Sequence, residues 1–164
     1  MAGENGTNIL DAVRRIPCGV FVLTSSFHDR RTGVLTRWVQ PCSTHPPHIM
    51  VAVARGLPIE PLIRDSRAFA LCQISAGDRL LLRSFATTPD NDDDPFVTLP
   101  SHDAPSGSPI IDRAMCYLDC ELVRHVVLDG DHRLYVGHVR AGAVLNPDGE
   151  PAIELGGNGL VPKD

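Results

Sequence analysis

The chain has 164 residues and a formal net charge of −5. This length suits one domain with a sizeable core, and the negative charge argues against a nucleic-acid binder, which normally presents a basic face. No run of about 18 apolar residues is present, so the sequence predicts no membrane-spanning helix. Because the first residues also lack the features of a secretory signal, we expect a single cytoplasmic domain over residues 1–164, with no membrane and no nucleic-acid partner.

Five cysteines occur without a Cys-x-x-Cys pair, and four of them lie inside apolar runs. This pattern predicts buried free thiols in a reducing compartment. Zinc held by Cys116, Cys120 and a histidine is the alternative, although the spacing fits no common zinc finger. The acidic run at 90–94 lacks the glycine and the distal glutamate of a calcium-binding loop, so it indicates a solvated loop. We therefore expect no metal.

Short apolar runs separated by turn residues predict many strands and few helices. In chain order we expect a helix at 8–15 capped by Thr7, strands at 18–25, from Gly33 onward and at 48–54, a helix at 58–66, a strand at 67–74, a helix at 79–85, and strands at 114–125, 134–143 and 152–155. The helix at 79–85 is expected to turn Leu80, Leu81 and Phe85 inward. Residues 1–6 are expected to be disordered, and residues 87–109 to form a long loop.

This pattern favours an antiparallel barrel with short helices packed on it. The strands follow one another closely, and the helices are too few for a doubly wound parallel sheet. No Gly-x-Gly-x-x-Gly follows a strand either. The expected fold class is therefore mainly β with minor α.

The segment from Gly33 to Pro47 is the strongest candidate for a ligand site. It contains the only tryptophan, Trp38, together with several small and polar residues, and it joins two apolar runs. Rigid scaffolds often place ligands on such strand-to-loop segments. The alternative is an edge strand and a turn, with Trp38 buried as a core anchor.

Two further features suit a ligand. Arg55 and Gly56 precede a predicted helix, and the arginine charge, the open glycine backbone and the helix N-terminus together suit a phosphate. His132 lies at the mouth of a predicted hairpin, where a side chain projects from the rim of a barrel; the alternative is a solvated turn histidine. The sequence contains no nucleophile elbow, no phosphate-gripping loop and no evident pair of catalytic carboxylates.

In this order and spacing, four stretches resemble the flavin reductase-like family over about residues 9–159. The stretches are residues 16–24, residues 33–53 with the double proline at 46–47, residues 62–71, and residues 118–139. The resemblance implies an FMN-binding split β-barrel of antiparallel Greek-key type with two or three short helices. It also implies a homodimer, with the flavin near the subunit interface.

The same resemblance implies a set of site residues. Those that would line the flavin ring and ribityl chain are Leu35, Thr36, Arg37, Trp38, Val39, Gln40 and Ser43. Arg55, with the backbone of Gly56 and Leu57, would hold the phosphate. His132 would lie near the nicotinamide of NAD(P)H or near the flavin edge. The implied cofactor is FMN, with FAD as the alternative.

Two positions depart from the family pattern. Many members have a small polar pair, commonly Thr and Ser, where this chain has Leu35 and Arg37. Leu35 cannot donate a hydrogen bond, and Arg37 is much larger. We therefore expect Arg37 to pair with the flavin phosphate or to hydrogen-bond the carbonyls of the flavin pyrimidine ring. The alternative is that Arg37 faces solvent.

The preferred hypothesis is an NAD(P)H-dependent flavin oxidoreductase that transfers a hydride from the nicotinamide to the flavin, with a monooxygenase or another electron acceptor as partner. A second hypothesis is an FMN-carrying electron-transfer protein of flavoredoxin type, without its own reaction with NAD(P)H. A third is a flavin-free dimeric split-barrel binding module, which the departures at Leu35 and Arg37 motivate.

Overall fold

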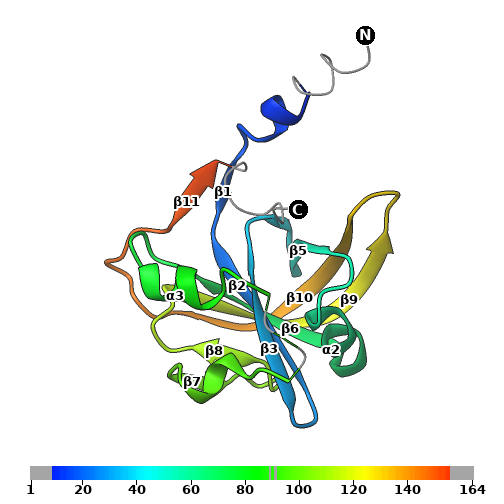
Figure 1. Cartoon of the computed structure of the whole chain (residues 1–164). Helices are drawn as coiled ribbons and strands as arrows, with labels where there is room; N and C mark the ends of the chain where they lie inside the picture. The colour runs from blue at the N-terminus through cyan, green and yellow to red at the C-terminus, as the bar shows by residue number, and fades with distance from the viewer. Residues whose placement is uncertain (1–8, 89, 91, 156–164) are drawn as a thin grey trace.

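The computed structural model describes residues 9–88, 90 and 92–155 of the chain. Within them the protein is built around one antiparallel sheet of seven strands, shown in Figure 1. These strands are β2 (Phe21–Phe27), β3 (Arg30–Thr36), β4 (Val39–Thr44), β5 (Pro47–Ala54), β6 (Ala68–Gln73), β9 (Cys116–Val127) and β10 (His132–Val144). They lie in the order β3-β2-β6-β9-β10-β5-β4.

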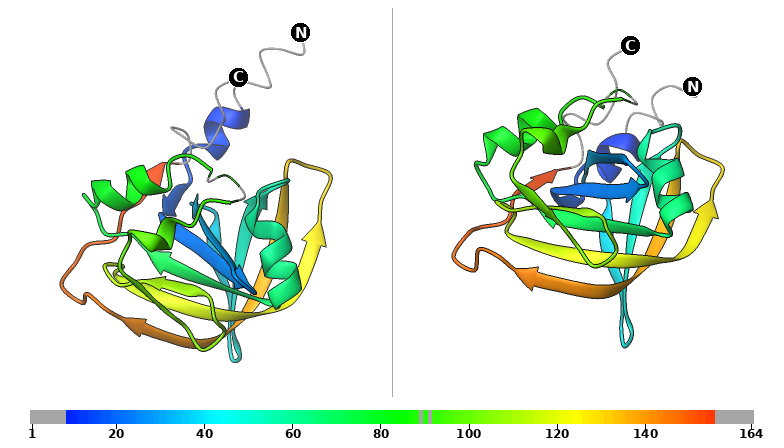
Figure 2. Two further views of the ribbon diagram at one scale, coloured as in Figure 1. Left: turned by 60° about the horizontal axis from the view of Figure 1, so that its bottom comes forward. Right: turned by 90° about the horizontal axis from the view of Figure 1, so that it is seen from below.

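The sheet curls into a barrel because its two edge strands are neighbours in the chain. β3 and β4 lie at opposite edges, yet only Arg37 and Trp38 separate them. Neighbouring strands are about 4.8 Å apart, so two residues cannot cross the width of a flat sheet of this size. The amide of Ala52 on β5 donates to the carbonyl of Trp38 at 3.0 Å. Figure 2 shows the curled sheet, which confirms the predicted antiparallel barrel.

Short helices and two small sheets surround this barrel. The helices are α2 (Ile59–Ser66), α3 (Arg79–Ser84) and the 3-10 turn η1 (Pro95–Val97), and residues 9–13 are also helical. One small sheet pairs β1 (Pro17–Gly19) with β11 (Ile153–Leu155), and the other pairs β7 (Ser101–Asp103) with β8 (Pro109–Ile111). α2 packs mainly on β2. β1, β11 and the helical residues before them project from the barrel (Figure 1).

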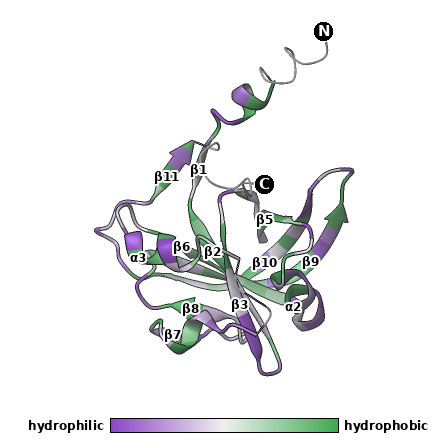
Figure 3. Cartoon of the chain, viewed as in Figure 1, coloured by the Kyte–Doolittle hydropathy of each residue, from purple (hydrophilic) through white to green (hydrophobic). Residues whose placement is uncertain are grey.

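The core has two layers because β2 and β6 are buried on both faces. Leu23 and Phe69 belong to one cluster, together with apolar residues of α2 and β5. Val22 and Cys72 point the other way, towards Leu81 of α3 and the apolar residues of β8. This explains why β6 and the first three residues of β2 are apolar without alternation. Figure 3 contrasts β2 with the hydrophilic tip of the β2–β3 hairpin.

The candidate segment from Gly33 to Pro47 differs from the expectation. The strand begins at Arg30 rather than Gly33, and the supposed loop contains β4, which pairs with β5 along the sheet edge. Trp38 is 42% exposed, so the interpretation of this residue as a buried core anchor was wrong. The reason is that the short link turns at Trp38 between two sheet edges and leaves the indole at the rim.

Other elements were predicted with errors that have physical causes. The strand expected at 18–25 is interrupted at Val20, whose amide donates to the Ala152 carbonyl and whose carbonyl accepts from the Ile74 amide. Leu80 is 51% exposed rather than inward, because α3 can turn only one face to the core, and Leu81 and Leu82 occupy it. The segment 87–109 contains η1, β7 and the start of β8 instead of forming one loop. The predicted disorder at 1–6 and the cap at Thr7 lie outside the described residues.

All five cysteines are free thiols in the structure. Cys72 and Cys120 are buried, as predicted, and burial raises the pKa of each thiol to about 12. Both therefore remain protonated and unreactive at neutral pH. The prediction of burial was wrong for the other three, since Cys18 and Cys116 are only partly buried and Cys42 is exposed. In the part of the chain that the structure describes, no three His, Cys, Asp or Glu side chains gather as metal ligands. No helix there is long and apolar enough to cross a membrane.

Gly137 of β10 provides a test of the barrel packing. A Cβ atom at this position would lie 2.6 Å from Cζ of Phe69 and 2.7 Å from Cβ of Cys120, both of which are buried. Gly137→Ala is therefore expected to lower the free energy of unfolding by about 1–3 kcal/mol, measured by urea denaturation.

Gly130 provides the matched control, because nothing lies within 4 Å of a Cβ atom built there. Gly130→Ala is expected to change the free energy of unfolding by less than about 0.5 kcal/mol. Equal destabilisation by the two substitutions would contradict the close packing of β10 on Phe69.

Candidate functional site

A cleft of about 550 Å³ opens where the two edges of the barrel approach each other. Residues 34–36 of β3 and 52–54 of β5 form its facing walls, and residues 85–88 after α3 cover one side. The link between β3 and β4, the start of β10 and Glu154 of β11 complete the lining. The closure of the barrel therefore creates the cleft, since the short link brings the edge strand β3 close to β5, the neighbour of the other edge strand β4.

Most of the predicted site residues gather around this cleft. Those that line it are Leu35, Thr36, Arg37, Trp38, Arg55, Leu57 and His132. Val39, Gln40 and Ser43 lie on β4, which leads away from the cleft along the outer edge of β5. Gly56 is also outside the lining. The cleft thus unites three segments that are distant in sequence: residues 35–38, 55–57 and 132.

Arg37 is a buried cation held by a carboxylate. Its side chain is only 7% exposed, so the alternative that it faces solvent was wrong. Its Nε donates to Oε2 of Glu154 at 2.7 Å, and its Nη2 lies 2.5 Å from the same oxygen. Its Nη1 is buried and has no hydrogen-bond partner among the described residues. The two N–H groups of Nη1 therefore lack an acceptor among these residues, in a side chain that lines the cleft.

Trp38 and His132 form an aromatic pair on the cleft wall. Their ring centroids are 4.4 Å apart and the planes are inclined by 52°. Nδ1 of His132 lies 2.7 Å from Oδ1 of Asp131, and this hydrogen bond holds the pKa of Asp131 below its ordinary value. His132 is three-quarters buried, so it is fixed against the indole rather than free in the turn.

Arg55 provides a second, more exposed cation at the cleft. Its backbone amide donates to the carbonyl of Asp131 at 2.9 Å, and its Nη2 donates to the carbonyl of Leu128. Among the residues that the structure describes, no carboxylate forms an ion pair with it. Its charge is therefore available to an anion that enters the cleft.

A buried carboxylate fixes the chain immediately after Arg55. Glu60 of α2 accepts hydrogen bonds from the Gly56 amide at 2.7 Å, from the Tyr135 hydroxyl at 2.8 Å and from Nη1 of Arg133 at 2.8 and 3.0 Å. Burial alone would raise the pKa of Glu60, but these hydrogen bonds hold it below its ordinary value. The Gly56 amide, which the sequence offered to a phosphate, is thus engaged within the protein.

Sequence reasoning missed two acidic residues and one wall of the cleft. Glu154 and Asp131 line it, as do Leu82 and residues 85–88. Glu154 is separated from Arg37 by more than a hundred positions, and no local pattern connects them. Asp131 was visible only as a turn residue, although it directly precedes His132.

Comparison with known proteins identifies the class. A family model described as "Flavin reductase like domain" matches residues 13–158. Among sequence relatives, a diflavin flavoprotein A 4 of Synechocystis sp. is 36% identical over 144 residues, which are 87% of this chain and 24% of the relative. A diflavin flavoprotein A 6 of Nostoc sp. is 32% identical over 148 residues, 90% of this chain and 26% of the relative. The chain thus spans about a quarter of the length of these relatives.

Solved structures show the same fold. The NADH:FAD oxidoreductase SgcE6 of Streptomyces globisporus superposes with a TM-score of 0.84 at 24% identity, covering 94% of this chain and 91% of that one. The flavin reductase PheA2 superposes with a TM-score of 0.78 at 21% identity, covering 93% and 94%. The fold is therefore the split β-barrel that these proteins share. The chain belongs to the flavin reductase-like family.

The Glu60 network predicts a specific pH dependence of stability. The pKa of Glu60 is lower in the folded than in the unfolded chain, so its ionised form stabilises the fold above the unfolded value, and this stabilisation is lost as the pH falls through the folded value. Glu60→Gln is expected to lower the free energy of unfolding by about 1.5–3 kcal/mol at pH 7. The free energy of unfolding of this variant should also fall less steeply below pH 5 than that of the wild type.

Urea denaturation of both proteins at pH 7 and at pH 4 measures this difference. The gap between wild type and Glu60→Gln should narrow at the lower pH. A gap that stays constant or widens would contradict the assignment of an ionised, hydrogen-bonded Glu60.

Proposed function

We propose that this chain is an NAD(P)H-dependent flavin reductase that holds FMN in the cleft, with FAD as the alternative cofactor. One observation carries the proposal: an apolar cleft of about 550 Å³ is bounded by an aromatic pair and by two arginines of different burial. Such a volume lies within the range of about 300–1,000 Å³ that is typical of sites for small organic ligands. A flavin combines a planar ring with polar edges and an anionic phosphate. The aromatic pair suits the ring, and the arginines suit the polar edge and the phosphate.

The residues that line the cleft match the successive parts of the cofactor. Leu35 and Thr36 line the facing edge of β3, and Trp38 and His132 present aromatic surface at the rim. Arg55 supplies an unpaired positive charge for the phosphate. The cofactor, when bound, supplies the acceptor atom for the hydride. The protein positions the reactants and excludes water.

His132 is the candidate for positioning the nicotinamide or the flavin edge. Its hydrogen bond to Asp131 and its contact with Trp38 fix the ring at the mouth of the cleft. Because hydride transfer needs no obligate acid or base, a residue that orients the two rings is sufficient. Val39, Gln40 and Ser43 remain predictions that no contact with the cleft supports.

A homodimer is part of the proposal. Large apolar side chains are exposed on the segment that projects from the barrel (Figure 1), including Ile9, Leu10, Val13 and Ile16, and on β11 at Ile153 and Leu155. Together with the exposed Trp38 they leave apolar surface close to the cleft, which suits association with a second copy. We place the protein in the cytoplasm and expect a monooxygenase or another electron acceptor to receive the reducing equivalents.

An FMN-carrying electron-transfer protein is the second candidate. The sequence relatives named diflavin flavoproteins favour it, since the matched segment is only about a quarter of each longer chain. The two functions differ in whether the protein itself reacts with NAD(P)H.

The activity is tested by following NADH and NADPH oxidation with added FMN. Stimulation by the protein supports the reductase. His132→Ala is expected to lower kcat/KM for the pyridine nucleotide about tenfold, which corresponds to about 1.4 kcal/mol of lost transition-state stabilisation.

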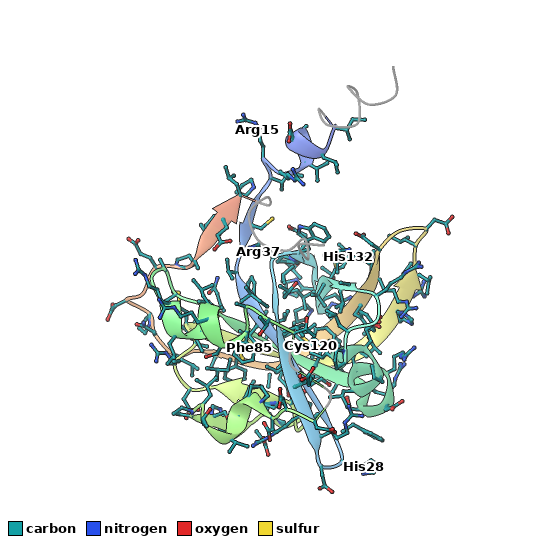
Figure 4. The ribbon with its side chains drawn as sticks, viewed as in Figure 1. Arg15, His28, Arg37, Phe85, Cys120 and His132 are labelled. Atoms are coloured by element: carbon teal, nitrogen blue, oxygen red, sulfur yellow. The ribbon has the colours of Figure 1, made fainter. Side chains whose placement is uncertain are left out.

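His28→Ala is the matched control, because His28 lies at the tip of the β2–β3 hairpin, far from Arg37 and His132 (Figure 4). It should leave the rate unchanged. Absence of NAD(P)H oxidation by a protein that retains flavin would favour the electron carrier. A protein that binds no flavin would favour the flavin-free binding module.

A further inference from the structure

We propose that Glu154 makes Arg37 selective for an uncharged oxygen of the flavin ring system, so that Arg37 binds a ring carbonyl and not the phosphate. This inference rests on the proposed function. It assigns a part in ligand recognition to Glu154, a residue of β11, and it separates the tasks of the two arginines in the cleft.

The Arg37–Glu154 pair carries no net charge. Both Nε and Nη2 of Arg37 are directed to the same carboxylate oxygen, at 2.7 and 2.5 Å. Such a charge-assisted pair is strong and holds the guanidinium in one orientation. Because the Glu154 charge offsets the Arg37 charge, the pair offers a hydrogen-bond donor without offering net positive charge.

The pair leaves one nitrogen of Arg37 without a hydrogen-bond partner in the described part of the chain. Nη1 of Arg37 is buried and has no partner among the residues that the structure describes, although Arg37 lines the cleft. A buried N–H without a partner is costly, and a carbonyl oxygen in the cleft would satisfy it. Nη1 carries two N–H groups, and one of them is enough for a carbonyl lone pair.

The carboxylate of Glu154 would repel a phosphate bound beside Arg37. The Glu154 carboxylate also lines the cleft, and a phosphate beside Arg37 would bring up to two negative charges close to it. At such separations repulsion is substantial even at an effective dielectric constant of about 20. An uncharged carbonyl does not incur this cost.

Arg55 provides the contrast that completes the assignment. It is exposed and forms no ion pair with a described carboxylate. The nearby Asp131 is hydrogen-bonded to His132, and the charge of Arg55 is the smallest of the influences on the pKa of that carboxyl. Of the two arginines, Arg55 therefore retains a net charge for the phosphate. The ion pair with Glu154 thus disfavours the expectation that Arg37 pairs with the flavin phosphate.

Riboflavin and FMN separate these roles, because they differ only in the phosphate. Dissociation constants for both are measured by quenching of flavin fluorescence. The double variant Arg37→Met/Glu154→Gln removes the pair without leaving an unpaired charge. It is expected to raise the dissociation constants of riboflavin and of FMN by the same factor, about tenfold or more.

Arg55→Met is the matched variant and should weaken the binding of FMN much more than the binding of riboflavin. Glu154→Gln alone frees the Arg37 charge and should shift the preference towards FMN by a fewfold. Where the double variant does not fold, as judged by circular dichroism, Arg37→Lys replaces it. Arg37→Lys keeps the charge but loses the planar fork, and it should again weaken both flavins alike.

The outcomes are distinct. A loss confined to FMN in the Arg37 variants, or no change for either flavin, would overturn the inference while leaving flavin binding intact. A wild-type protein that binds neither riboflavin nor FMN would overturn the proposed function itself.

Discussion

The link of two residues between β3 and β4 is the constraint on which the rest of the structure depends. It joins strands at opposite edges of a seven-stranded sheet, so the sheet has to roll until those edges meet. The same link places Arg37 and Trp38 at the seam, one buried and the other half-exposed. The cleft is the space that remains along the seam, because β3 and β5 approach there without pairing. The closed barrel and the cleft therefore have the same structural cause.

The polar groups around the cleft are fixed from outside it. Glu60 holds the Gly56 amide and the side chains of Arg133 and Tyr135 beneath the Arg55 turn. Asp131 orients His132, and Glu154 orients Arg37. Arg37, His132 and Arg55 are thus each held by a carboxylate or a backbone carbonyl, which reduces the side-chain freedom that ligand binding would have to remove. This arrangement suits a family in which the cofactor performs the chemistry and the protein supplies geometry.

Local sequence patterns predicted the elements whose stability is local. The hairpin of β2 and β3, the strand β5 and the helix after Pro58 follow from β-branched runs and from the proline position. The same patterns misjudged β4, because Pro41 and the polar residues around it are tolerated only at a sheet edge, and edges are defined by topology. Leu80 was predicted to point inward because three consecutive leucines do not indicate which face of a helix is turned to the core. Glu154 was missed because a polar residue on a three-residue strand becomes part of a site only through its partner across the barrel.

β11 has a consequence for the dynamics of the cleft. The strand has only three residues, its partner β1 is equally short, and both project from the barrel. Such a small sheet opens by local unfolding at a lower free energy than the barrel core. Because Glu154 lies on it, each opening removes the counter-ion of Arg37 and exposes a buried guanidinium. A ligand that binds to the Arg37–Glu154 pair therefore also stabilises β1 and β11 against opening. The rate of amide hydrogen exchange in these two strands then depends on whether the cleft is occupied.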